Sequence, residues 1–167
     1  MLDRWSFGGG TSLMLQIDHR ESFDAYSSDG THALKIVFKD IGEIDFIVAP
    51  ALTPEPYREK EVRGQIVNLE TPAEIIAKKI FYRGASMQPR DMFDIACVRK
   101  SEGDARLIDA LTPFKDACSQ ALNAARKMNP RLAETVMSKL LYRPNYSEIP
   151  SQAQQRTIEL LEEVCAH

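Results

Sequence analysis

Apolar and polar residues alternate along the first third of the chain in the manner of short strands. Leu34, Ile36 and Phe38 share one face of the stretch 33–39, which is typical of a half-buried β-strand. A turn follows, and Glu43–Ala49 has a second strand-like pattern. These two stretches predict a β-hairpin.

Helical spacing dominates from residue 71 onward. Thr71 is a candidate N-cap, Pro72 fits the first helical position, and Glu74 completes the sequence pattern of a capping box. Gly84 is a plausible stop for this helix. A second helix is expected at about Asp91–Arg99, and more helices are expected in the remainder of the chain.

The segments around the hairpin predict the rest of the sheet. A short strand at Arg4–Phe7 leads through a glycine turn into a helix at Thr11–Ile17, and Gln65–Leu69 is a further candidate strand. Pro50–Lys60 contains three prolines and few apolar residues, so we expect a loop there.

The order of these elements predicts an α+β fold. We expect a core with a small mixed sheet at residues 1–100 and a helical C-terminal region at residues 101–167. The composition agrees with a folded domain, because 44% of the 167 residues are hydrophobic and the net charge is only −3. This near-neutral charge argues against electrostatic coating of nucleic acid, although a local basic patch is still compatible with it.

Sequence features at the level of the whole chain predict a cytoplasmic protein. Met1–Arg4 lacks the basic and apolar segments of a secretory signal, and no apolar run approaches the ~18 residues of a membrane span. The three cysteines, Cys97, Cys118 and Cys165, lack the spacing of a disulfide framework or a zinc site.

The glycine turn is the first candidate for chemistry. In Phe7-Gly8-Gly9-Gly10-Thr11-Ser12, glycines precede a predicted helix, so backbone N–H groups and hydroxyls could approach a phosphate. The segment lacks the lysine of a Walker loop. A purely structural glycine turn is the alternative.

Carboxylates supply the second candidate. Asp24 closes the segment His19-Arg20-Glu21-Ser22-Phe23-Asp24, and Asp45 interrupts the apolar strand Ile44–Val48. Aspartate is disfavoured within strands, and Mg²⁺ coordination would explain its presence there. A solvated loop and an exposed sheet face are the alternatives.

Two predicted helices carry opposite charges. Lys79 and Arg83 lie four residues apart on one helix, and Asp91 and Asp94 lie three apart on the next. The cations could neutralise a triphosphate. Ion pairing between the two helices is the structural alternative.

The order of these segments resembles the AbiEii/AbiGii-type nucleotidyltransferases, the toxins of abortive-infection toxin–antitoxin systems. The resemblance covers roughly residues 6–98. The matching stretches are Gly9-Gly10-Thr11-Ser12-Leu13, His19-Arg20-Glu21-Ser22-Phe23-Asp24, Glu43-Ile44-Asp45, Thr71-Pro72-Ala73-Glu74-Ile75-Ile76-Ala77-Lys78-Lys79 and Arg90-Asp91-Met92-Phe93-Asp94-Ile95.

The resemblance implies a polymerase-beta-type nucleotidyltransferase fold and Mg²⁺-dependent transfer of a nucleoside monophosphate from a nucleoside triphosphate to an acceptor such as the 3′ end of tRNA. It also implies a cognate antitoxin protein as a partner. The implied catalytic residues are Asp24, Asp45, Lys79 and Asp91, with Asp24 and Asp45 as metal ligands. The implied nucleotide-binding residues are Gly9, Gly10, Thr11, Ser12, Arg20, Ser22, Lys79 and Arg90.

One departure from the family pattern bears on activity. The family has Ser-x-Asp-x-Asp, whereas Ser22-Phe23-Asp24 is followed here by Ala25-Tyr26, so the second aspartate is absent. Either the encoded protein contains further residues after Asp24, or the chain is shortened and inactive. The alternative function is therefore a catalytically inactive nucleotide-binding or protein-interaction module of the same fold. A plain helical scaffold is a third interpretation.

Overall fold

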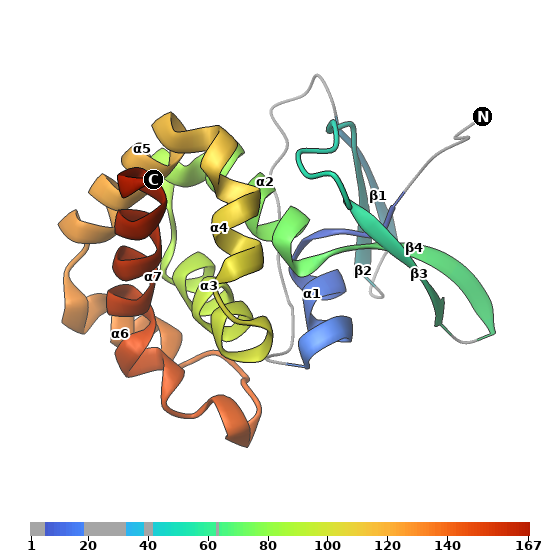
Figure 1. The fold of residues 1–167 in the computed structure, drawn as a ribbon. Coiled ribbons are helices and arrows are strands. Elements are labelled where there is room, and N and C mark those ends of the chain that lie inside the picture. The colour runs from blue at the N-terminus through green and yellow to red at the C-terminus, as the bar shows by residue number, and fades with distance from the viewer. Residues whose placement is uncertain (1–5, 19–32, 39–41, 63) are drawn as a thin grey trace.

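The computed structural model describes residues 6–18, 33–38, 42–62 and 64–167. Figure 1 shows the strands at one end of the molecule and most of the helices at the other. The predicted α+β class is confirmed, with helices as the larger part. None of the helices in these ranges combines the length and the apolar character needed to cross a membrane.

The described strands form two antiparallel pairs. The predicted hairpin is present, with β1 (Ala33–Phe38) paired to β2 (Gly42–Ile47). The second pair joins β3 (Tyr57–Val62) to β4 (Gln65–Glu70). We expected one small mixed sheet, but the described strands form two separate two-stranded sheets. Parallel pairing within the described ranges is limited to a bridge between Phe7 and Leu69.

The prediction of a loop throughout Pro50–Lys60 is wrong at its C-terminal end, where β3 begins at Tyr57. Tyr57 to Glu61 are all exposed, so this strand lacks the alternation of buried and exposed residues that makes a strand recognisable. Backbone pairing with β4 holds β3 in place, and that pairing leaves no periodic signal in the sequence.

The helices follow the start signals in the sequence. Their bounds are α1 Gly9–Ile17, α2 Pro72–Arg83, α3 Pro89–Glu102, α4 Ala105–Leu111, α5 Lys115–Lys127, α6 Pro130–Met137 and α7 Ile149–Ala166, with 3₁₀ turns at η1 Gly84–Ser86, η2 Thr112–Phe114 and η3 Pro144–Tyr146. The predicted cap of α2 is confirmed, because the Thr71 side chain accepts a hydrogen bond from the Glu74 N–H at 3.2 Å. Gly84 ends α2 as predicted, but in a right-handed conformation that continues into η1.

A single cluster of buried side chains spans the two halves of the chain. Leu13 of α1, Ile76 of α2 and Phe93 of α3 belong to the same core as Leu161 of α7. Helix α7 packs against both α3 and α5. The first three helices are therefore supported by the C-terminal ones, and a division of the chain near residue 100 stays a prediction.

Gly84 fits a close contact between η1 and α5, and this contact yields a first prediction. A Cβ atom at Gly84 would lie 3.0 Å from the Ala121 Cβ and 3.1 Å from the Ala117 carbonyl oxygen. We expect Gly84→Val to lower the free energy of unfolding by about 1–3 kcal/mol, because overpacking forces the helices apart. Urea unfolding followed by circular dichroism measures the change. The control is Ala85→Val, at an exposed position in the same turn; equal stabilities of the two variants would contradict the prediction.

Candidate functional site

A buried ionic cluster joins α2 to α3. The Lys79 Nζ lies 2.8 Å from the Asp91 Oδ1 and 2.9 Å from the Asp94 Oδ2. Arg83 makes a further ion pair with Asp91. The side chains of Lys79, Asp91 and Asp94 are 9%, 2% and 0% exposed. The structure therefore shows the ion pairing between α2 and α3 that the charge pattern allowed. The Lys79 ammonium group lies between two carboxylates.

The helix pattern explains why these charges meet. Residues three or four positions apart share one face of a helix, so Lys79 and Arg83 both face α3, and Asp91 and Asp94 both face α2. Asp91 has a second role, because its Oδ2 accepts a hydrogen bond from the Gln88 N–H at 3.0 Å and completes a capping box at the start of α3.

The cluster shifts the ionisation of its members toward the charged forms. Burial by itself would raise the pKa of Asp91, but the charges of Lys79 and Arg83 and the hydrogen bonds to this carboxylate hold the pKa below its ordinary value. Burial would lower the pKa of Lys79, but Asp94 and Asp91 raise it above its ordinary value. Both groups are therefore charged at neutral pH.

A second ionic network lies on the neighbouring face of α2. The Lys78 Nζ lies 2.6 Å from Glu70 Oε1 and 3.2 Å from Glu74 Oε1. The Ser6 hydroxyl also donates to Glu70, at 3.1 Å. Lys78 therefore links the end of β4 to the first turns of α2.

Glu74 anchors the segment that precedes β3. Its side chain is completely buried and accepts hydrogen bonds from the Leu52 N–H at 3.0 Å and from the Thr53 N–H and hydroxyl at 2.8 Å each. In a capping box this carboxylate would accept from the Thr71 N–H, which instead donates to the Pro56 carbonyl. The sequence pattern therefore identified the helix start correctly but missed the partner of Glu74.

The glycine turn lies against this second network. Helix α1 begins at Gly9, whose φ is +74° and at which an added Cβ atom would meet no atom within 4 Å. At Gly8, a Cβ atom would lie 2.0 Å from a carboxylate oxygen of Glu70. A side chain at Gly8 would therefore have to displace the Glu70 carboxylate, while Gly9 faces open space.

Ser12 lies on the inner side of α1. Its side chain is buried, and its hydroxyl is 3.2 Å from the Gln16 Nε2, which also donates to the Glu70 carbonyl at 2.6 Å. The role of Ser12 in holding phosphate stays a prediction. The hydrogen bonds that Gln16 makes to Ser12 and Glu70 were not predicted, because neither Gln16 nor Glu70 belongs to a recognisable motif.

The predicted site residues that the structure describes fall into three groups. Lys79 and Asp91 meet in the cluster between α2 and α3, with Arg90 partly buried at the start of α3. Gly9, Gly10, Thr11 and Ser12 form the first turn of α1, which packs against α2 and α3. Asp45 lies in β2 opposite Lys35 of β1. Arg20, Ser22 and Asp24 lie outside the described residues.

The described carboxylates do not themselves form a metal centre. Lys79 pairs with both Asp91 and Asp94, and Arg83 adds a second cation to Asp91, so these carboxylates are neutralised by side chains. Among the residues that the structure describes, no group of three or more His, Cys, Asp or Glu residues is placed to hold a metal ion. A Mg²⁺ site at Asp24 and Asp45 stays a prediction.

Comparison with models of known protein families, with curated proteins and with solved structures gives no match to this chain.

Proposed function

We propose that the chain is a Mg²⁺-dependent nucleotidyltransferase that transfers a nucleoside monophosphate from a nucleoside triphosphate to an acceptor such as the 3′ end of tRNA, and that it acts as the toxin of a toxin–antitoxin system. The observation that supports this most is the meeting of three segments of the resemblance. The two most specific segments lie in α2 and α3 and share the buried cluster at Lys79, and α1, which begins at the glycine turn, packs against both helices.

The proposed roles follow from the charges of these residues. The N–H groups at the start of α1 would bind phosphate oxygens, and Arg83, the most exposed cation of the cluster, would face the triphosphate. Asp91 would position Lys79 so that its charge stabilises the leaving pyrophosphate. Arg90 would add a phosphate contact. Asp24 and Asp45 would hold Mg²⁺, whose charge would be the means of activating the attacking hydroxyl.

A transfer assay tests this function and gives a second prediction. Purified protein is incubated with each labelled nucleoside triphosphate, Mg²⁺ and total RNA. We expect label to enter RNA, and we expect Asp45→Ala to reduce the rate by about 100-fold or more, because a metal ligand is lost. Asp116→Ala, at an exposed position on α5, is the matched control. The proposal fails if none of the four nucleotides is transferred and Asp45→Ala leaves cell toxicity unchanged.

One observation favours a second candidate, a catalytically inactive nucleotide-binding or protein-interaction module of the same fold. The aspartate expected two residues after Asp24 is absent, and Asp91 and Asp94 are occupied by cationic side chains. Calorimetry distinguishes the two functions. Triphosphate binding that does not change with Mg²⁺, in a protein without turnover, would favour the module.

A further inference from the structure

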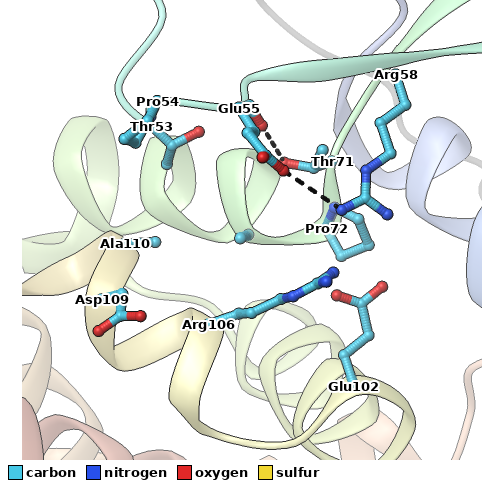
Figure 2. Close-up of a pocket in the computed structure, with 11 residues that line it drawn as sticks. Thr53, Pro54, Glu55, Arg58, Thr71, Pro72, Glu102, Arg106, Asp109 and Ala110 are labelled. Carbon is cyan, nitrogen blue, oxygen red and sulfur yellow. Dashed lines mark hydrogen bonds and ion pairs between the residues drawn. The ribbon is translucent and has the colours of Figure 1, made fainter.

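A pocket of about 280 Å³ lies at the opposite end of α2 from Arg83. Figure 2 shows that it is enclosed by the segment before β3, the start of α2 and the neighbouring parts of α3 and α4. None of the predicted transferase-site residues whose side chains the structure describes lines it. Its size is close to the lower limit of ~300 Å³ for small-molecule sites.

Two arginines from different elements meet at this pocket. Arg58 comes from β3 and Arg106 from α4, and Figure 2 shows their guanidinium groups extending toward each other. Arg106 is exposed and makes no hydrogen bond or ion pair with any residue that the structure describes. Within the described part of the chain, the one partner of the Arg58 side chain is Glu55, in an ion pair of 3.6 Å. An anion between the two guanidinium groups would accept hydrogen bonds from both.

The wall of the pocket beside these arginines is apolar. Pro54, Pro72 and Ala110 contribute rings and methyl groups without hydrogen-bonding side chains. Such a surface suits the face of a base or ribose and offers little to a bare inorganic anion. The combination of an apolar wall and two guanidinium groups therefore favours a ligand that carries both a ring system and a phosphate.

We propose that this pocket binds one nucleotide, with its phosphate between Arg58 and Arg106 and its base or sugar against Pro72. The nucleotide could be a free mononucleotide or the terminal nucleotide of an RNA strand. The second source rests on the proposed transferase function, for which the strand would be the acceptor. Pro72 and Lys79 are seven residues apart on α2, or about 10 Å along the helix axis.

The acidic residues at the pocket limit the charge of its ligand. Glu55, Glu102 and Asp109 line it together with the two arginines, so the charged lining residues sum to −1. A monophosphate therefore fits better than a triphosphate. The same charges predict how substitutions change the affinity for the nucleotide. Glu102→Gln removes a negative charge and should tighten binding by about two- to fivefold, whereas loss of an arginine should weaken binding.

Calorimetric titration of the full chain with AMP tests the proposal and gives a third prediction. We expect AMP to bind, adenosine to bind at least tenfold more weakly because it lacks the phosphate, and Arg106→Ala to weaken AMP binding at least tenfold. Arg131→Ala removes an exposed arginine from α6, away from the pocket, and is the matched control. The proposal is overturned if neither AMP nor the other three nucleoside monophosphates bind at millimolar concentration, or if Arg106→Ala and Arg131→Ala bind them equally well.

A second titration distinguishes the two sources of the nucleotide. A five-nucleotide RNA that binds more tightly than AMP, with the same dependence on Arg106, identifies a strand end as the ligand. Equal or weaker binding of the RNA identifies a free mononucleotide. The transferase proposal is tested separately with Asp45→Ala, which should keep its AMP affinity because the proposed role of Asp45 is to hold Mg²⁺ for the transfer step. Loss of transfer and loss of nucleotide binding are therefore independent outcomes.

Discussion

Replacing Lys79 by methionine is expected to lower the free energy of unfolding by about 3–5 kcal/mol, the usual range for removing one partner of a buried ion pair. The substitution keeps most of the side-chain volume but removes the ammonium group that lies 2.8 Å from Asp91 and 2.9 Å from Asp94. Both carboxylates are almost completely buried and would lose this partner together. Urea unfolding at pH 7, followed by circular dichroism, measures the loss.

The pH dependence of this loss provides a sharper test. In the unsubstituted protein the pKa of Asp91 is lowered, so its contribution to stability is present above the ordinary carboxyl pKa and disappears as the pH falls through the lowered value. In Lys79→Met the carboxylates no longer have the lysine charge, so protonation should become less unfavourable. We therefore expect the stability difference between the two proteins to shrink as the pH is lowered from 7 to 4.

A suitable control is Lys127→Met, which removes an exposed lysine at the end of α5 and should change stability by no more than about 0.5 kcal/mol. A deficit for Lys79→Met below 1 kcal/mol, or one that stays constant between pH 7 and pH 4, would contradict a structural role for the cluster.

The helices could be predicted because their signals are local. The Thr71 cap, the proline that follows it and the spacing of apolar residues all lie within one or two turns of the element they define. Strand β3 could not be predicted in the same way. Arg58 to Glu61 are all charged and exposed, and the strand depends on pairing with β4 rather than on an apolar face of its own.

The contacts of the candidate site show the same difference between local and distant sequence signals. The sequence allowed ion pairs of Lys79 with Asp91 and Asp94, because opposite charges on two successive helices can pair when the helices pack together. The network of Glu70 and Glu74 was missed. Lys78 is close in sequence, but the partners outside α2, including Ser6 and Thr53, lie 21 to 64 residues away, and no spacing rule connects them to Glu70 and Glu74.

Replacing Glu74 by glutamine is expected to destabilise the protein by about 2–4 kcal/mol. The carboxylate is fully buried and receives hydrogen bonds from the Leu52 N–H, the Thr53 N–H and the Thr53 hydroxyl while pairing with Lys78. Glutamine has nearly the same shape, but its NH₂ group would face donors and its lost charge would leave Lys78 with one carboxylate fewer. Urea unfolding and amide hydrogen exchange at Leu52 and Thr53 measure the effect, and both amides should exchange faster.

The matched control is Glu134→Gln, at an exposed position on α6 that has no side-chain partner among the described residues. Unchanged stability and unchanged exchange at Thr53 would show that Glu74 does not anchor the segment before β3. Thr53 also lines the nucleotide pocket. Because Glu74 holds that wall against α2, Glu74→Gln should weaken AMP binding even though Glu74 does not line the pocket. The two proposed sites are thereby connected through a single helix, with the pocket at its first turn and the Lys79 cluster two turns further along.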